Sequence, residues 1–426
     1  MKLTQNDRIK QVHEGTIVVG IDIASDTHYA RAFDWRGVEL GKVISFSNRR
    51  EGFLELFRWI QALQKKHGKS SVLLGAEPTG HYWFSLADYA EGSGIKLVLV
   101  NPHHVKKSKE LDDNHPTKND RKDAKTIAKL VVEGRYMEPY IPEGDFAELR
   151  VAMDSRYRIL KEIGSQKNRM ERWLKIYFPE YKDVFKSPYG KASLVVLRHC
   201  PLPEEVRALG PEKINELWRK EKLRAVGSKR ARRLHKASEA SIGRQEGTRA
   251  ARLEMMNLLD DYAHKVAQLE EVEGLIRTLL YGIPQIEKVL AIKGMGLMSA
   301  AGIFAEIGDI GRFDSPKQIQ KLAGLAIREN RSGKHQGGTG ISRRGRKRLR
   351  TILFQVILPM VATNEAFAEL HSYYTKRDKN PLKKKQSLIA LCCKLIRIIF
   401  GICTKGFEFD GQKMLSDIKR PLEQAA

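Results

Sequence analysis

Apolar and polar positions alternate over the first 140 residues in a pattern typical of strands and helices. Residues 16–23 form a nearly continuous apolar run rich in β-branched side chains, which predicts a buried central strand. Two further runs joined by Arg36 and Gly37 predict a hairpin, and residues 49–67 carry apolar side chains at helical spacing. The predicted order is three strands (16–23, 28–35, 38–46), a helix (49–67), a strand (72–76), a helix after residue 80, a strand (96–100) and a helix near 120–134.

This order predicts a mixed sheet covered by helices, because a hairpin followed by right-handed βα units places the connecting helices on the faces of a sheet. RNase H-like nuclease domains share the same order. The fold class predicted for the whole chain is α/β plus all-α, with an RNase H-like mixed-sheet domain, a long coiled-coil-like helix and a helical C-terminal domain.

The middle of the chain, from about 145 to 250, is very basic and less periodic, and it contains the run Lys-Arg-Ala-Arg-Arg at 229–233. Its charges form either a solvated face or a track for a polyphosphate. From 248 to 280 the apolar side chains step by three and four, which predicts a long helix. The resulting seam either packs within the chain or joins two copies. It consists of Leu259, Tyr262, Val266, Leu269, Val272, Ile276 and Leu279.

From residue 283 the pattern becomes helix, glycine-rich turn, helix. Residues 284–290 and 299–307 are the predicted helices, and Lys293, Gly294 and Gly296 lie in the turn. Glycines allow positive φ and leave N–H groups exposed at the next helix start, which suits a phosphate. The pattern indicates either a helix-hairpin-helix unit for nucleic acid or an ordinary helix pair. A glycine-rich basic loop (328–340) and helices near 346–362, 365–374 and 382–402 follow.

The charge of the chain narrows the class of its partners. Lys and Arg number 76 against 51 Asp and Glu in 426 residues, which gives a formal net charge of +25. Such an excess favours a polyanion, either nucleic acid or an anionic membrane surface. The nearest candidate for a membrane span, 387–403, is interrupted by Lys394 and Arg397, so it is predicted to be a core helix.

A cytoplasmic setting is expected from the N-terminus and the cysteines. The first residues lack the apolar stretch of a signal peptide. None of the cysteines forms a Cys-x-x-Cys pair with nearby His, so structural zinc is not expected and reduced thiols are. They are Cys200, Cys392, Cys393 and Cys403.

Four carboxylates predict a metal site. Asp22 ends the first predicted strand and Glu77 follows the fourth, so both emerge at one carboxyl edge if those strands are neighbours. Asp120 and Asp123 are three residues apart on one helix face. Gathered carboxylates repel one another unless cations neutralise them, and their oxygens suit Mg²⁺ or Mn²⁺, paired about 4 Å apart on a phosphodiester. Nearby Asp26, Glu110, Asp112 and Asp113 are interpreted as solvated acids or substitute ligands.

Motifs in both halves of the chain resemble one family. The N-terminal half carries GIDIASDTH, GAEPTGHYW and NPHHVKK followed by KNDRKDAKTIA. The C-terminal half carries IPQIEKVLAIKGMGLMSAAGIFAEIGDIGRF, KLAGLAIRENRSGK, GISRRGRKRLR and a late KLIRIIF helix. Over residues 15–140 and 280–405 the chain thereby resembles the DEDD-type insertion-sequence transposases, which act as bridge-RNA-guided DNA recombinases. The resemblance implies that Asp22, Glu77, Asp120 and Asp123 are the family's acidic set.

The resemblance also implies a serine nucleophile in a C-terminal transposase domain, for which two serines compete. Ser332 lies in a loop of glycines and cations, and such a setting can favour the alkoxide that attack requires. Ser342 directly precedes a basic helix, where an N-cap is the ordinary explanation of a serine. The Ser-Gly step of the family falls on Ser332, which is therefore the predicted nucleophile. His335 could act as a proton shuttle, but a lone histidine in a loop is more often a phosphate contact or a bystander. It is therefore left out of the catalytic set.

Five segments and one cationic set complete the predicted organisation. The segments are an RNase H/RuvC-like metal domain (1–140), a basic helical insert or linker contacting RNA or DNA (141–247), a long coiled-coil helix for dimerisation (248–281), a transposase domain with the serine (282–410) and a tail (411–426). The residues predicted to bind nucleic acid are Lys106, Lys107, Lys293, Gly294, Gly296, Arg328, Arg331, Lys334, Arg343, Arg344, Arg346, Lys347, Arg348 and Arg350.

Three functions are compatible with these residues. The leading hypothesis is an RNA-guided serine recombinase of the bacterial nucleoid that moves its insertion sequence. It would use Mg²⁺ and a noncoding bridge RNA on double-stranded target and donor DNA, as a dimer assembling to a tetramer. The second is a metal-dependent endonuclease of the junction-resolvase type, in which water attacks and no covalent intermediate forms. The third is a nucleic-acid-binding architectural protein with a decayed nuclease fold.

Overall fold

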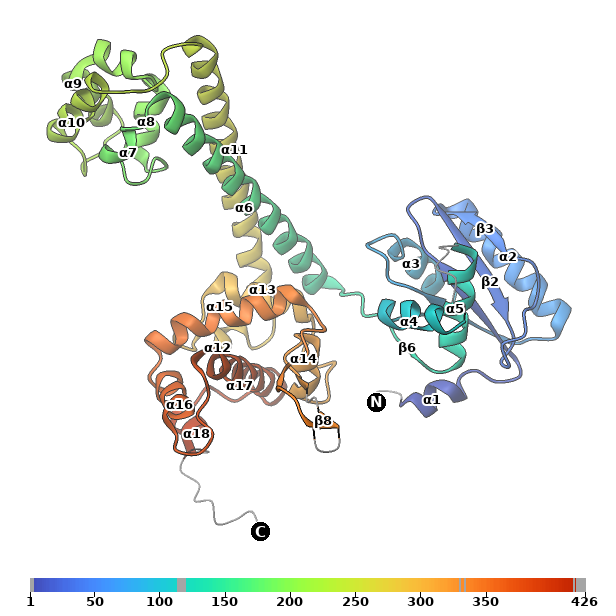
Figure 1. Ribbon diagram of the computed structural model, residues 1–426. Helices are drawn as coiled ribbons and strands as arrows, with labels where there is room; N and C mark the ends of the chain where they lie inside the picture. Colours follow the sequence, from blue (N-terminus) through green and yellow to red (C-terminus); the bar gives the residue numbers. More distant parts are fainter. Residues whose placement is uncertain (1–3, 113–119, 329–330, 333–334, 417, 419–426) are drawn as a thin grey trace. The chain divides into compact units, whose positions relative to one another are not determined.

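The computed structural model describes residues 4–112, 120–328, 331–332, 335–416 and 418, and within these ranges it leaves the side chains of 109–112, 120–122, 331–332 and 335–336 undescribed. The chain divides into two compact units, Met1–Ile141 and Pro142–Ala426. Figure 1 shows the mixed sheet of the first unit and the helices of the second.

The first unit is built on a six-stranded mixed sheet with the order β3-β2-β1-β4-β5-β6. The central strand β1 is buried along nearly its whole length, as its continuous apolar run predicted. The parallel strands are β1 (Thr16–Asp22), β4 (Ser71–Ala76) and β5 (Lys96–Val100), and the antiparallel strands are β2 (Thr27–Phe33), β3 (Ile44–Ser47) and β6 (Tyr136–Met137).

Helices cover both faces of this sheet. One face carries α2 (Arg50–His67) and α3 (Phe84–Gly92), and the other carries α5 (Asp120–Val132), with Val105 of α4 (Pro102–Asp112) joining the same core. The predicted order of strands and helices is confirmed. The short elements α1 (Gln5–Lys10), α4 and β6 were not predicted, and the third strand is shorter than the expected 38–46.

The second unit begins with a long antiparallel helix pair, α6 (Gly144–Tyr177) and α11 (Thr248–Tyr281). Arg156 pairs with Glu273 and Lys265 with Glu162, so the two helices run past each other along most of their length (Figure 1). Leu259 and Ile276 of the predicted seam are buried within the chain. The seam therefore packs within one chain, and dimerisation through α11 stays a prediction.

The basic middle of the chain forms a helical subdomain with its own core. Its helices are α7 (Tyr181–Val184), α8 (Lys191–His199), α9 (Pro203–Lys220) and α10 (Ser228–Glu239). Trp173, Tyr181 and Trp218 are fully buried there, with the ends of α6 and α11. A region that looked only weakly periodic is thus well packed, because single large aromatics fill its core in place of a repeating apolar stripe.

The C-terminal part of the second unit packs around a separate core. Its helices are α12 (Ile286–Leu290), α13 (Leu297–Ile307), α14 (Pro316–Leu322), α15 (Lys347–Thr363), α16 (Glu365–Lys376), α17 (Lys384–Lys405) and α18 (Gly411–Ser416). In the segment predicted as a tail, α18 buries Met414 and Leu415.

One described helix, α17, is long and apolar enough to cross a membrane, and α15 with α16 would pass the same test as a pair bent by 101°. Leu391, Leu395 and Ile399 of α17 are buried in the protein. The prediction that this segment is a core helix is confirmed, because its apolar side chains already have protein partners.

Candidate functional site

Asp22 and Glu77 emerge at the same edge of the sheet. Strands β1 and β4 are parallel, and Ile21 lies opposite Ala76. Asp22, which ends β1, and Glu77, which follows β4, are therefore the next positions in register, and both are half-buried. The strand order predicted this shared edge, and their role as metal ligands stays a prediction.

Helix α5 brings Asp123 to this edge. A Cβ added to Gly20 would lie 1.9 Å from the carbonyl oxygen of Ala124, so the backbone of α5 rests directly on β1. Only glycine permits that approach. Asp123, just before Ala124, is 9% exposed. Asp22 is two residues after Gly20 and therefore on the same face of β1. Three elements, β1, the end of β4 and α5, thus each place an acidic residue toward one edge of the sheet.

The donor chemistry of this edge suits a hard divalent cation. Carboxylate oxygens are the ligands that Mg²⁺ and Mn²⁺ prefer. Asp120 begins α5, one helical turn before Asp123, but its side chain is not among those described. Among the side chains that are described, no three from His, Cys, Asp and Glu stand close enough to hold one ion. The predicted set of Asp22, Glu77, Asp120 and Asp123 therefore fits a divalent cation by residue type, and its role as a metal site stays a prediction. Of the nearby acids, Asp113 also lies outside the described residues.

Two polar residues that contact the loops at this edge, one buried and one half-buried, were not singled out from the sequence. His28 in β2 is fully buried, and its Nδ1 accepts a hydrogen bond from the Ala24 N–H at 3.2 Å. Asn48 follows β3 and donates through Nδ2 to the Tyr82 carbonyl at 3.3 Å. The available signal was a histidine on the inward-facing side of a strand, but its partners lie in loops that the sequence does not connect.

Ser332 lies in a hairpin of the second unit that has two short ladders. At the base, β7 (Ile327–Arg328) pairs with β10 (Gly340–Ile341). Farther out, β8 (Arg331–Ser332) pairs with β9 (His335–Gln336), and Ser332 stands opposite His335 in that register. Lys334 lies outside the described residues, and the side chains of Arg331, Ser332 and His335 are likewise undescribed. The role of Ser332 as nucleophile stays a prediction.

The base of this hairpin is held tightly. Ser342 N–H donates to the Ala326 carbonyl at 2.8 Å, and Arg343 N–H donates to the Gly324 carbonyl at 3.0 Å. Arg343 adopts a φ of 56°, which is uncommon for a residue with a side chain. Helix α15 begins at Lys347 with Arg346 at its N-cap position. The interpretation of Ser342 as a helix N-cap is therefore wrong, because the serine belongs to the hairpin base.

The cations around α15 divide into two groups. Arg346 donates to the Glu306 carbonyl at 2.7 Å, and Arg350 donates to the Ala323 carbonyl at 2.8 Å. Arg348 pairs with Asp154 and lies 4.5 Å from the centre of the Tyr157 ring. These three arginines hold parts of the unit together. Arg343, Arg344 and Lys347 are exposed; Arg348 is exposed too, but its guanidinium is paired with Asp154. The second group is the more accessible to phosphates, and the binding role of all six stays a prediction.

The other predicted binding residues fall into similar classes. Gly294 has a φ of 96°, and an added Cβ would lie 2.9 Å from the Met360 side chain, so this glycine packs against α15. Gly296 is the N-cap of α13 and is exposed. The turn is compatible with a helix-hairpin-helix unit, which stays a prediction. Lys106, Lys107, Lys293 and Arg328 have exposed side chains.

The basic middle region presents an exposed cationic face on α10. Ala231 and Leu234 face the core, while the opposite side, here called the α10 ridge, is exposed. The ridge consists of Lys229, Arg232, Arg233 and Lys236. Arg233 also donates to the Asp183 carbonyl at 2.8 Å. Such a row suits a phosphate backbone, because neighbouring cations on one helix face lie about one turn apart.

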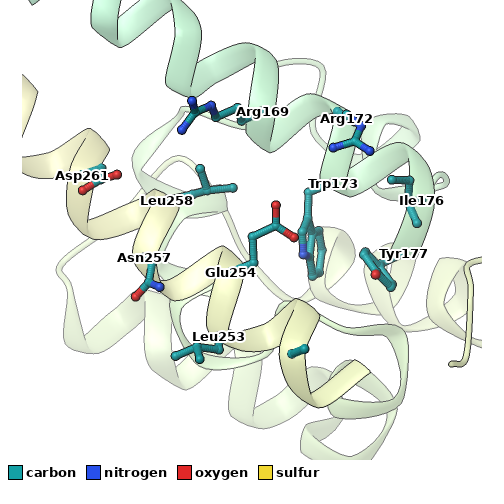
Figure 2. Close-up of a pocket in the computed structure, with 11 residues that line it drawn as sticks. Arg169, Arg172, Trp173, Ile176, Tyr177, Leu253, Glu254, Asn257, Leu258 and Asp261 are labelled. Atoms are coloured by element: carbon teal, nitrogen blue, oxygen red, sulfur yellow. The ribbon is translucent and has the colours of Figure 1, made fainter. Parts of the chain in front are cut away.

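An open groove of about 550 Å³ lies between α6 and α11. Figure 2 shows Arg169 and Arg172 on α6 and Glu254 and Asp261 on α11, with Glu254 beside Trp173. Its lining includes none of the predicted site residues that the structure describes. Because charges of both signs meet there, it does not continue the cationic surface of α10.

Comparison with known proteins matches both halves of the chain to transposases. A family model described as a transposase, of the DEDD type named for the insertion sequence IS110, matches residues 19–179. A second, described as the transposase IS116/IS110/IS902 family, matches residues 286–373. Together the two matches span more than half of the chain.

Individual relatives agree with these matches. The pilin gene-inverting protein of Moraxella bovis is 25% identical over 92% of this chain and 97% of its own length. The transposase for insertion sequence element IS1111A of Coxiella burnetii is 24% identical over 91% of this chain and 90% of its own length. A putative transposase of Sinorhizobium fredii is 32% identical over 31% of this chain and 33% of its own length.

Proposed function

Because this chain belongs to the IS110-type transposase family, we propose that it cuts and rejoins DNA with a serine nucleophile and a divalent metal ion. One observation carries the proposal. The four carboxylates fall within the first family match and Ser332 falls within the second, so one chain would hold both halves of the proposed chemistry. Relatives named for inverting a gene and for moving an insertion sequence support the same interpretation, since both outcomes require cutting and rejoining.

The carboxylate edge would hold the metal. Asp22, Glu77, Asp120 and Asp123 offer oxygen donors of the kind that Mg²⁺ and Mn²⁺ prefer. A bound ion would supply charge stabilisation for the phosphate oxygens during displacement. These residues would hold and orient the ion, and Asp123 is itself buried.

Ser332 would supply the attacking oxygen. As its hydroxyl loses a proton, the oxygen forms a bond to phosphorus, the bond from phosphorus to the leaving sugar oxygen breaks, and that oxygen takes up a proton. The phosphoserine ester keeps the bond energy, so the reverse step rejoins DNA without ATP. The exposed side chains of Arg343 and Arg344 can offset charge on the phosphate.

Trapping the covalent adduct on labelled DNA tests this chemistry. We expect Ser332→Ala to abolish the protein–DNA adduct and recombination, and Ser342→Ala to keep both while serving as the matched control. Asp22→Asn should abolish adduct formation without loss of folding. An adduct formed by Ser332→Ala would refute the serine's role. Cleaved ends free of protein in the wild type would instead favour the junction-resolvase type of endonuclease.

RNA guidance and assembly are part of the same proposal. The net charge of +25 and the α10 ridge favour nucleic-acid partners. Pairing with a guide RNA would let the protein recognise backbone geometry while the RNA reads sequence. Strand exchange requires at least two protomers, for which a dimer assembling to a tetramer is proposed. Sequencing the RNA that copurifies from the native host tests this: one discrete noncoding species is expected, and a random mixture would contradict guidance.

A further inference from the structure

We propose that Asn48 and His28 form a polar link that fixes the loops following Asp22 and Glu77 and thereby positions both carboxylates for the divalent ion. The inference rests on the metal-dependent chemistry proposed above. Both residues are positioning residues, since they act through the loops and do not contact DNA or metal themselves.

Asn48 joins the two loops directly. Its backbone N–H donates to the Asp26 carbonyl at 2.8 Å, and its Nδ2 lies 3.4 Å from the Ser25 carbonyl oxygen, both in the loop after β1. The same Nδ2 donates to the Tyr82 carbonyl at 3.3 Å, in the segment between Glu77 and α3. One amide side chain therefore ties together the two turns that leave the carboxylate edge.

His28 holds the loop after β1 through a hydrogen bond to its backbone. Its Nδ1 accepts from the Ala24 N–H, so the neutral ring carries its proton on Nε2. The ring packs edge-on against Phe46, with the centroids 5.2 Å apart. Burial lowers the pKa of His28, and the neighbouring Asn48 side chain partly opposes that lowering.

The pair also holds an unused donor and an unused acceptor. Nε2 of His28 and Oδ1 of Asn48 are both buried, and neither has a hydrogen-bond partner in the part of the chain that is described. Buried polar groups are rarely left without partners, because the unmade bond lowers stability. The two atoms are complementary, so a small closure of the loops around a bound ion would let the Nε2–H donate to Oδ1.

Metal binding and loop exchange test the link in the full chain. His28→Phe keeps the ring packed against Phe46 and removes both nitrogens, and Asn48→Ala removes the amide. We expect each to raise the Mn²⁺ dissociation constant about tenfold by calorimetry, the low end of the effect of residues that support metal ligands. In the metal-free protein, amide exchange of residues 23–26 and 78–83 should become faster. His28→Gln should lie nearer the wild type, because its amide can accept and donate as the ring does.

Tyr136→Phe is the matched control in the same unit. Its hydroxyl lies 3.2 Å from the Arg8 carbonyl oxygen and 2.9 Å from Gln11 Oε1, so this variant also loses buried hydrogen bonds but acts at α1. It should lower the unfolding temperature and leave Mn²⁺ affinity unchanged. If Asn48→Ala and His28→Phe both bind Mn²⁺ with wild-type affinity, this inference is overturned while the proposed function stands. A wild type that binds no Mn²⁺ would overturn the proposed function with it.

Discussion

Arginines that look equivalent in the segment GISRRGRKRLR differ in what they contact. Arg350 donates to the Ala323 carbonyl on one side of the hairpin base and lies 3.4 Å from the Arg343 carbonyl oxygen on the other. Arg344 and Lys347 are exposed instead. Both carbonyl oxygens face the same nitrogen, Nη1, which carries two N–H donors in the fixed plane of the guanidinium. The hairpin that bears Ser332 therefore depends on an arginine that the sequence alone assigns to phosphate binding.

Substitutions of these cations should separate binding from stability. In Arg344→Gln with Lys347→Gln, the slope of log affinity for duplex DNA against log salt should fall by about 0.9 for each phosphate that the protein no longer neutralises. Arg350→Gln should leave that slope unchanged but cost about 1.5–3 kcal/mol of stability, the range for hydrogen bonds to charged groups. Fluorescence anisotropy across a salt series and thermal unfolding measure the two effects. A lower slope in Arg350→Gln would show that this residue also binds phosphate.

The acidic residues of the candidate site could be predicted from the sequence, and its supporting residues could not. Asp22 and Glu77 are predictable because a strand's end is visible in the apolar pattern, and parallel neighbours end at one edge. His28 and Asn48 are not, because their partners Ala24, Ser25 and Tyr82 lie in irregular loops. Loop hydrogen bonds leave no periodic signal in a sequence.

At the scale of helices and strands, the same distinction holds. The sheet of the first unit was predicted because β1 and β4 are short apolar runs between polar segments. The individual helices α7–α10 could not be predicted from the sequence. Their core is built by Trp173, Tyr181 and Trp218, which occur at irregular intervals along the chain. A high content of basic residues also makes the amphipathic pattern of a helix harder to recognise here. Five of the 12 residues of α10 are Lys or Arg, yet Ala231 and Leu234 give the helix a buried face.

The α10 ridge should bind nucleic acid in a way that is separable from folding. Replacing Lys229, Arg232 and Lys236 by Gln removes three exposed cations. We expect weaker binding to a DNA duplex or a structured RNA and a salt slope lower by up to about 2.7, at 0.9 for each neutralised phosphate. The unfolding temperature should not change. Replacing Lys42, Lys65 and Lys66, which are exposed on the first unit, removes the same charge. Equally weakened binding in both triple variants would mean that net charge, and not the ridge, sets the affinity.

At the scale of the whole molecule, the two units have separate cores. Two apolar clusters lie on the two faces of the sheet and belong to residues of the first unit alone. The other two clusters draw on residues after 142. Units that share no core are expected to unfold independently, since cooperativity comes from shared burial. The family matches fall in a corresponding order, with most of one on the first unit and all of the other on the second.

At least two thermal transitions are therefore expected in calorimetry, one for the first unit and one or more for the second, whose two cores are joined by α6 and α11. The transitions of the two units should be moved by different substitutions. Gly20→Ala forces a Cβ to within 1.9 Å of the Ala124 carbonyl oxygen, and such overpacking costs about 1–3 kcal/mol or more. It should lower only the transition of the first unit. Trp173→Ala empties a buried site and removes the hydrogen bond from Nε1 to the Ala251 carbonyl, so the second unit alone should be destabilised by about 3–5 kcal/mol. Gly92→Ala, where an added Cβ meets nothing within 4 Å, is the control and should move neither transition downward. A single transition lowered by both Gly20→Ala and Trp173→Ala would show that the units fold as one, and the carboxylate edge and the serine hairpin would then be coupled even without DNA.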